Sequence, residues 1–399
     1  MNILKKLKAE NIWAYRIPVY FFVARLLLVV SIPIEGLKSY GDFWFYFSLA
    51  DLGVPFLELW VEYPPFFPFL SRIVYLAVGG REHSYIYFLV ILFSLVQSIN
   101  IFLFVKIAHK IYDRVESLTR IIIYSFLLVA VFYGWAYFDS LGVFCMLFGL
   151  LLTLNKKDIS SGLVLGVGGV VKWFPLLLLP TSWLWLGWRK AIKVIIPALL
   201  VLLVSWGYLF MVSPDFTEAS IMSQGAKGSW ETVWAILDGN METGNFGLSA
   251  DRQIAETALQ PTGRPSRISP WLTLILFCGV GLALFLGSRV DSEKAAIGFF
   301  GVTFVLFLLW SPGYSPQWVL YLLPLVMLAF EKRRSVLLAI VLLFVNLLEW
   351  PILLSRGLFQ YLDEIILLRT GILILMAVLF GQKVLILKQS EEKVEIETP

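Results

Sequence analysis

The chain has 399 residues, of which 59% are apolar and 15% are charged, and it contains 32 Phe, 16 Tyr and 15 Trp. Soluble domains are nearer half apolar and a quarter charged, so this composition excludes a chain built of soluble domains. The net charge of +4 says little about partners, and we expect no nucleic acid among them. The two Cys and two His are too few and too far apart for a disulfide framework or a metal site.

Repeated apolar runs separated by short charged connections predict an all-α polytopic membrane protein, with about twelve transmembrane helices and both termini in the cytoplasm. We expect one transmembrane domain over 1–399. The predicted spans are 17–33, 85–105, 121–137, 140–154, 160–172, 174–188, 193–212, 270–288, 296–311, 316–330, 335–354 and 364–387.

The distribution of basic residues supports this arrangement. It places 21 Lys and Arg on the cytoplasmic side and ten outside, as the positive-inside rule requires. The segment 160–188 could instead form one long helix kinked at Pro175, which would invert the chain after it. That inversion would move eleven basic residues outside and bring only six inside, so we predict two short spans.

Two polar segments fall on the outer side, 34–84 and 213–269. The first mixes acids with many aromatic side chains, which predicts interfacial helices at the membrane–water boundary. The second is rich in Gly, Ser, Thr and Pro and is long for a structureless connection. Such loops are usually lids, binding loops or disordered segments.

The first outer segment carries two candidate acids. Asp42 follows the first span, where a water-filled cavity would hold it ionised as a general base; alternatively it is only the N-cap of a helix over 43–52. Glu62 and Tyr63 precede Pro64-Pro65, which would fix their orientation, although a solvated interfacial turn is the simpler interpretation. We expect Asp51 and Glu58 to be ordinary surface acids.

Two further charges fall at span ends. Asp139 either caps the helix that follows it or shares a cavity with Asp42, which is predicted on the same side. Lys172 lies below the outer surface, where an unpaired ammonium costs about 2.5–3.5 kcal/mol. We favour a phosphate as its partner over snorkelling to the interface. Arg72 could also meet phosphate, but snorkelling is the simpler account of it.

The segment SPGYSPQW (311–318) carries two Ser-Pro steps on the outer side. Tyr314 and Gln317 offer hydrogen bonds there, and Trp318 offers a face on which a sugar can stack. The alternative is a tight turn with a Trp in the interfacial aromatic belt.

These segments, in this order, resemble a known family. They are GDFWFYFSLADLGVP (41–55), EYPPF (62–66), YFDSLGVF (137–144), VVKWFPLLLLP (170–180) and SPGYSPQWVLYLLPL (311–325). Together they are similar to the GT-C superfamily of membrane glycosyltransferases. Within it, they look most like the polyprenol-phosphate-mannose-dependent type, which comprises glycosyltransferase family 87 and its prokaryotic relatives.

The resemblance implies a GT-C-like fold in a prokaryotic cell membrane. A hexose, mannose-like, would pass from a polyprenyl-phosphate donor to a glycan or glycolipid acceptor, with inversion, on the extracytoplasmic face. Asp42 matches the base of the family, Glu62 and Tyr63 match the pre-proline pair, and Lys172 matches the basic position near the donor phosphate. We expect Asp139 to join the catalytic acids, and Arg72, Tyr314, Gln317 and Trp318 to bind substrate. No cofactor is expected, the need for a divalent metal is left open because no residue indicates one, and the segment 213–269 matches nothing that would identify the acceptor.

Two other classes remain open from the residues alone. A transporter or lipid flippase would also have about twelve spans, but it should show ionisable groups near the midplane and a repeat relating its halves. A non-enzymatic membrane scaffold would not need acids at 42, 62 and 139 on one side.

Overall fold

The computed structural model describes residues 2–240 and 246–385. It is helical, and the described residues form only isolated β-bridges in place of a sheet. The α-helices are α1 (Asn2–Ser31), α2 (Ile34–Lys38), α3 (Phe43–Leu52), α4 (Phe66–Ala77), α5 (Glu82–Ile111), α6 (Arg114–Ala130), α7 (Tyr133–Ala136), α8 (Asp139–Leu154), α9 (Asp158–Val171), α10 (Leu179–Leu186), α11 (Trp188–Val212), α12 (Pro214–Ala226), α13 (Val233–Asp238), α14 (Pro270–Gly287), α15 (Glu293–Trp310), α16 (Val319–Ala329), α17 (Lys332–Leu347) and α18 (Leu362–Gly381). Short helical turns are η1 (Phe174–Leu178), η2 (Ser249–Gln253), η3 (Ala255–Leu259), η4 (Pro316–Trp318), η5 (Leu348–Leu353), η6 (Leu354–Arg356) and η7 (Phe359–Tyr361).

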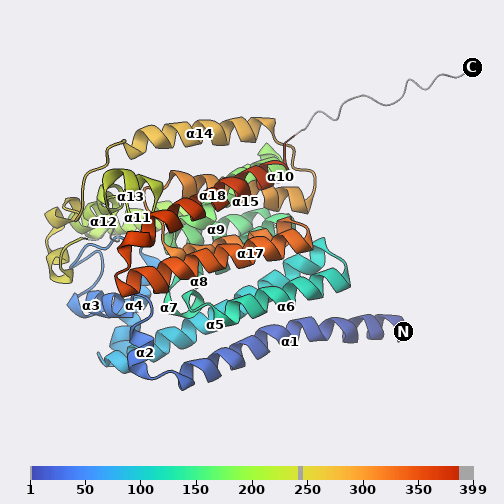
Figure 1. Ribbon diagram of the computed structural model, residues 1–399, viewed down its shortest axis with the longest axis horizontal. Helices are drawn as coiled ribbons and strands as arrows, with labels where there is room; N and C mark the ends of the chain where they lie inside the picture. Colours follow the sequence, from blue (N-terminus) through green and yellow to red (C-terminus); the bar gives the residue numbers. More distant parts are fainter. Residues whose placement is uncertain (1, 241–245, 386–399) are drawn as a thin grey trace, which may run out of the picture.

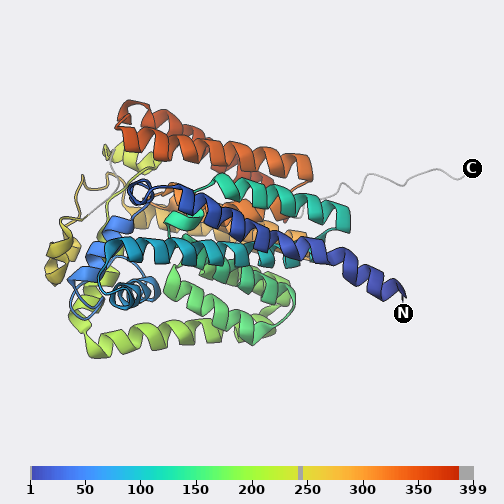
Figure 2. The same cartoon turned by 90° about the horizontal axis from the view of Figure 1, so that it is seen from below.

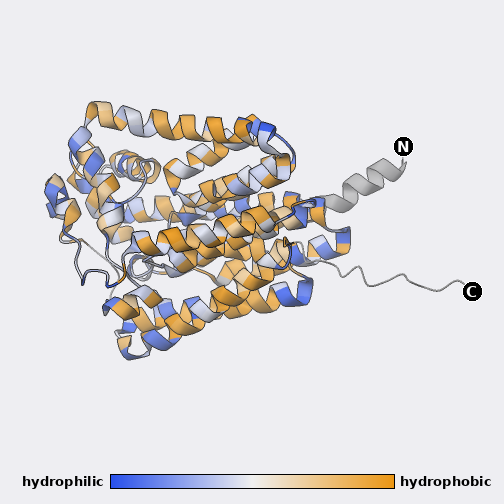
Figure 3. Ribbon diagram, turned by 90° about the horizontal axis from the view of Figure 1, so that it is seen from above, coloured by the Kyte–Doolittle hydropathy of each residue, from blue (hydrophilic) through white to orange (hydrophobic). Residues whose placement is uncertain are grey.

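The long helices lie side by side in a bundle, and the two polar segments gather at one end of it (Figures 1 and 2). Hydrophobic residues cover the middle of the bundle, and hydrophilic residues concentrate at its two ends (Figure 3). Seven helices among the described residues are long and apolar enough to cross a membrane. The protein is therefore an all-helical integral membrane protein.

A helix lies in each predicted span range, but several are short for a bilayer. Besides α6, these are α8, α9, the η1–α10 pair and η4–α16. The predicted end of the third span at 137 is wrong, because α6 ends at Ala130. There the guanidinium of Arg25 donates to the carbonyls of Leu128 and Val131. These hydrogen bonds take the place of those that the next turn of the helix would supply. Residues 386–387 of the last predicted span lie outside the described residues.

The chain reverses at Lys172, as the charge distribution predicted. A Cβ on Gly168 would lie only 2.7 Å from the Pro175 side chain, so the two sides of the break pack against each other. At the far end, the ammonium of Lys156 lies 6.0 Å from the ring of Trp185. The segment is thus a hairpin of two short helices, and the single kinked helix is excluded.

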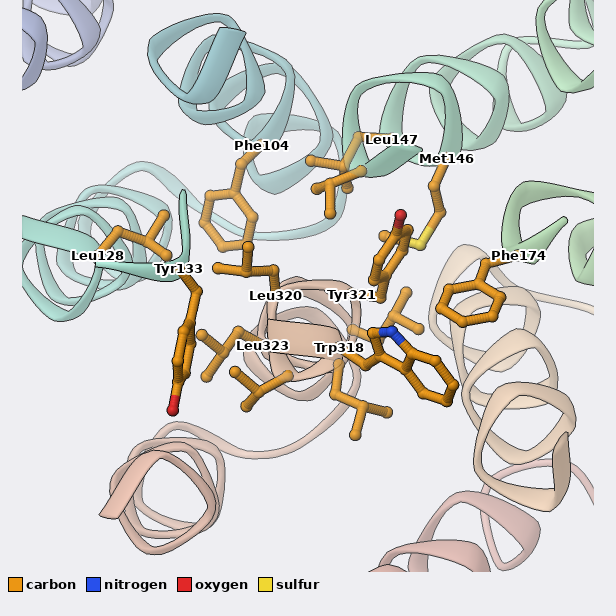
Figure 4. Packing of buried hydrophobic residues seen from close by; sticks show 14 of the residues in the cluster. Phe104, Leu128, Tyr133, Met146, Leu147, Phe174, Trp318, Leu320, Tyr321 and Leu323 are labelled. Carbon is orange, nitrogen blue, oxygen red and sulfur yellow. The ribbon is translucent and has the colours of Figure 1, made fainter. Parts of the chain in front are cut away.

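The core surrounds α16, whose residues are all buried. Phe104 of α5 and Met146 of α8 point toward it from neighbouring helices (Figure 4). Trp318 and Tyr321 pack against Phe174, with ring centroids 4.9 and 5.0 Å apart. The break after Lys172 is therefore anchored directly on the core, which fixes the polar residues that precede it.

The second polar segment is more ordered than its composition suggested. It forms α12, α13, η2 and η3 in its described part, and residues 241–245 of this loop lie outside the described residues. It packs on the first segment, where the Trp60 indole donates to the carbonyl of Ile254 and to Thr257. The Val61 amide donates to Ser220 of α12. The two polar segments thus form one layer over the end of the bundle.

Candidate functional site

A cavity of about 1150 Å³ lies beneath this layer. Helices α3, α8, α12 and α15 contribute to its wall, together with the break at Lys172 and the turn before α16. Its aromatic lining consists of Trp44, Phe45, Tyr46, Tyr63, Tyr137, Phe138, Trp173, Phe174, Trp230, Phe246, Phe307, Trp310, Trp318, Trp350 and Phe359. A cavity with so many rings and a few convergent charges suits a carbohydrate or an amphipathic ligand.

Most of the predicted site residues line this cavity. They are Asp42, Glu62, Tyr63, Asp139, Lys172, Gln317 and Trp318. Residues that are far apart in sequence therefore meet in one place. Trp318 is only 8% exposed and lies 5.4 Å from the Lys172 ammonium, so it is not a lipid-facing belt residue.

Arg72 and Tyr314 lie outside the cavity lining. The Arg72 guanidinium donates to the carbonyl of Ala50 and lies over the ring of Tyr75. The hydroxyl of Tyr314 is buried and donates to Asn346 at 2.8 Å. Both side chains make contacts that stabilise the helix ends around the site. The exposed acids Asp51 and Glu58 also lie outside the lining, as expected of surface acids.

Asp42 stands at the N-cap position of α3, but its side chain makes no capping hydrogen bond. The carboxylate faces the cavity instead, and the hydroxyl of Tyr46 donates to it over 3.5 Å. Burial raises the pKa of Asp42 to about 6, and the nearby acids Asp139 and Glu62 add to this shift. Lys227 and Lys172 oppose it, and the net result is a carboxylate that titrates just below neutral pH.

Gly41 sets the position of Asp42. Its φ is +74°, and a Cβ there would lie 2.6 Å from the carbonyl oxygen of Ala136. The turn thus needs a residue without a side chain, because it combines a left-handed backbone with close contact to a second chain segment.

We expect Gly41→Ala to reduce activity about a hundredfold, because relief of the clash moves Asp42 away from its present position. Gly79→Ala is the matched control. Gly79 has a φ of +64°, but nothing lies within 4 Å of its missing Cβ, so it carries only the backbone penalty of roughly 1–2 kcal/mol. Equal activity of the two variants would show that the contact with Ala136 does not matter.

Asp139 and Lys172 form an ion pair inside the cavity. The ammonium lies 2.5 Å from Oδ1 of Asp139, and the two side chains are 14% and 1% exposed. Asp139 is the first residue of α8 and does not cap that helix, so the N-cap interpretation is wrong. Lys172 points into the cavity, within 5.5 Å of three aromatic rings, and does not snorkel. The anion expected beside Lys172 is, in this structure, Asp139.

Glu62 is bound by Arg252 of the second polar segment. Both guanidinium NH groups donate to the carboxylate, which is 8% exposed. Burial alone would raise the pKa of Glu62, but Arg252 and Lys227 outweigh it and hold that pKa below its usual value. Arg252 is in turn packed against the rings of Phe45 and Trp60. The pair joins the two polar segments in the wall of the cavity.

We expect Arg252→Met to open the second polar segment, because it leaves Glu62 buried without its partner, at a cost of about 3–5 kcal/mol. Limited proteolysis of the purified protein should then cut within 213–269 faster than in the wild type. Arg267→Met is the matched control, since Arg267 is exposed and, within the described part of the chain, only its backbone amide makes a hydrogen bond. If the Arg252 variant is as resistant to proteolysis as the wild type, the Glu62–Arg252 ion pair does not hold the second polar segment in place.

Lys227 and Glu231 also line the cavity, and the sequence did not single them out. The Lys227 ammonium lies 4.5 Å from the ring of Trp230, and no described carboxylate comes within 4.0 Å of it. Burial lowers the pKa of Lys227, although Glu62 and Asp42 raise it. A single Lys in a Gly- and Ser-rich loop carries no sequence signal. Both residues become candidates for the site only because the folded segment places them in the wall of the cavity.

The family model for glycosyltransferase family 87 matches residues 60–312. The chain belongs to this family. No curated protein and no solved structure matches it significantly. The family and the apolar helices together make it an integral membrane glycosyltransferase, which disfavours the transporter alternative.

The matched range contains most of the charged groups of the cavity. It includes Glu62, Asp139, Lys172, Lys227 and Arg252. Asp42 and the segment 314–318 lie outside the matched range. The family match therefore does not bear on Asp42 of this family 87 protein, and its role rests on the geometry of the cavity.

Proposed function

We propose that the protein transfers a hexose, mannose-like, from a polyprenyl-phosphate donor to a glycan or glycolipid acceptor, with inversion. The observation that carries this proposal is the arrangement of charge in the cavity. Asp42, a carboxylate that titrates just below neutral pH, shares an aromatic-lined cavity with two lysines at one end of a membrane bundle.

Asp42 is the general base of the proposed reaction. It accepts the proton of an acceptor hydroxyl while that oxygen forms a bond to the anomeric carbon. The bond from this carbon to the phosphate oxygen breaks on the opposite face, and its electrons leave with the polyprenyl phosphate. Glu62 is a poorer candidate for this role because both of its oxygens are bonded to Arg252. Glu62 and Asp139 act by positioning the groups around the base.

Lys227 and Lys172 stabilise the departing phosphate. Lys227 lies in the cavity without a carboxylate partner among residues 2–240 and 246–385, and it would gain most from an incoming phosphate. Lys172 is paired with Asp139, so it would share its charge between that acid and the donor. Tyr63, Gln317 and Trp318 line the same space and offer hydrogen bonds and a stacking face to the sugar.

The isoprenoid chain would lie along the apolar side of the cavity. This side is formed by Phe307 and Trp310 of α15 and by Trp350, Leu354 and Phe359 from the α17–α18 connection. With twelve spans and the basic residues in the cytoplasm, the cavity opens on the extracytoplasmic side. A lipid-linked donor suits such a site because its activation resides in the anomeric phosphate bond.

The direct test is transfer by the full chain purified in detergent. The protein is incubated with synthetic polyprenyl phosphates carrying labelled mannose, glucose or galactose, together with a glycolipid and glycan extract of the membranes. We expect a labelled product from one of these donors, with inverted anomeric configuration by NMR. Transfer from nucleotide sugars alone would overturn the proposal.

A further inference from the structure

Glu231 has an unusual backbone for its position. Its φ is +50°, in the left-handed region that residues with a side chain rarely adopt. The flanking residues hold it there, since the Trp230 amide donates to Pro312 at 3.2 Å and the Thr232 hydroxyl donates to the same carbonyl at 2.8 Å. Arg369 donates to the carbonyl of Glu231 itself. Strained residues fixed in this way from several sides are concentrated at functional sites.

The side chain of Glu231 lacks the partners that a buried acid needs. Only 2% of the residue is exposed, and Oε2 has no hydrogen-bond partner among the described residues. The nearby cation, Arg369, is already paired with Glu349. Glu231 is nevertheless one of the residues that line the cavity. A buried polar group without a protein partner is costly unless a ligand supplies the missing hydrogen bonds.

The surroundings of Glu231 indicate which ligand that is. Burial raises its pKa to about 8, with Arg369 and Lys227 lowering it and Asp42 raising it, so the group is mostly uncharged at neutral pH. A protonated carboxyl offers one donor and one acceptor, which is the pattern that a sugar hydroxyl complements. The adjacent Trp230 and nearby Trp318 supply aromatic surface, and their ring centroids are 6.4 Å apart.

We propose that Glu231 binds the transferred sugar, exchanging hydrogen bonds with its hydroxyls and selecting which hexose is accepted. Lys227 is four residues earlier in the same loop, lines the same cavity and interacts electrostatically with Glu231, so a sugar attached to a phosphate at Lys227 would lie near Glu231. This inference rests on the function proposed above. It assigns Glu231 to binding, separate from the base Asp42.

The test compares Glu231→Gln and Glu231→Met, using the hexosyl polyprenyl phosphate that wild type transfers best and its monodeoxy analogues. The amide keeps a donor and an acceptor, so we expect Glu231→Gln to stay within about tenfold of the wild-type kcat/KM. Glu231→Met should lose about 10- to 100-fold with the intact hexose and little with the deoxy analogue that lacks the bound hydroxyl. The ratio of kcat/KM for the intact hexose to kcat/KM for that deoxy analogue should therefore fall in Glu231→Met and not in Glu231→Gln.

Thermal unfolding separates this role from a structural one. Because Oε2 of Glu231 has no hydrogen-bond partner among the described residues, Glu231→Met should melt at or above the wild-type temperature. Glu218→Met, at an exposed acid of α12 outside the cavity, is the matched control and should leave both kcat/KM and discrimination unchanged. Wild-type discrimination in Glu231→Met would overturn the role of Glu231 alone. Absence of transfer by the wild type from any lipid-linked donor would instead overturn the proposed function.

Discussion

Asp42→Asn should lower kcat by about 10²–10⁴-fold, which is the contribution expected of a general base. The amide has nearly the same shape and can still accept the hydrogen bond from Tyr46, but it cannot take a proton from the acceptor. Because the wild-type carboxylate is partly desolvated, the variant should melt at or above the wild-type temperature at pH 7.5. A loss of activity without a loss of stability is the signature of a residue that acts in the chemical step.

The pH dependence gives a second signature of the same residue. Asp42 acts as a base only when ionised, and burial raises its pKa to about 6. The rate should therefore be constant above that pH and fall tenfold for each pH unit below it. The acidic limb should disappear from the residual activity of Asp42→Asn, because the variant has no proton to lose at this position.

Asp51→Asn is the matched control for this experiment. Asp51 lies on the same helix, α3, but it is exposed, accepts a hydrogen bond from Tyr75 and does not line the cavity. Its amide variant should keep both the rate and the acidic limb. If Asp42→Asn transfers sugar at the wild-type rate, another group is the base, and Glu231 is the next carboxyl to examine.

The hairpin over 160–188 shows what the sequence could predict. The choice between one kinked helix and two short ones depended on the charge of every later connection, and those charges are local and easily counted. The same reasoning placed Asp42, Asp139 and Lys172 at one end of the bundle, because each follows or precedes an apolar run. Which residues share one end of a helical bundle is therefore readable from the pattern of apolar runs, and the side of the membrane that this end faces stays a prediction.

The pairing of the charges was not readable in this way. Glu62 and Arg252 are 190 positions apart, and nothing near either residue indicates the other. The sequence predicts that Asp139 caps a helix or shares a cavity with Asp42, and that Lys172 meets a phosphate, yet the two residues form an ion pair. Lys227 and Glu231 line the cavity only because the segment 213–269 folds onto the first polar segment. Contacts of this kind depend on packing between segments, which periodicity and composition do not report.

Lys172→Met should destabilise the protein by about 3–5 kcal/mol, because it leaves the carboxyl group of Asp139 buried without its cation. The double variant Asp139→Asn/Lys172→Met removes both charges and should recover most of that loss. Unfolding titrations in mixed detergent micelles measure the free energies of unfolding of the wild type, Asp139→Asn, Lys172→Met and the double variant. These four values form a double-mutant cycle, which separates the interaction of the pair from the effects of the single substitutions.

Donor binding then separates the structural role of Lys172 from its proposed contact with phosphate. We expect the stable double variant to bind a polyprenyl phosphate about tenfold more weakly than the wild type in calorimetry, since one of two cations near the phosphate is missing. Lys157→Met, at an exposed lysine just before α9, should change neither stability nor binding. If the double variant binds as tightly as the wild type, Lys172 serves only to hold Asp139, and Lys227 alone receives the phosphate. If Lys172→Met is as stable as the wild type, Asp139 has another way to satisfy its charge, and the two residues no longer act as a pair.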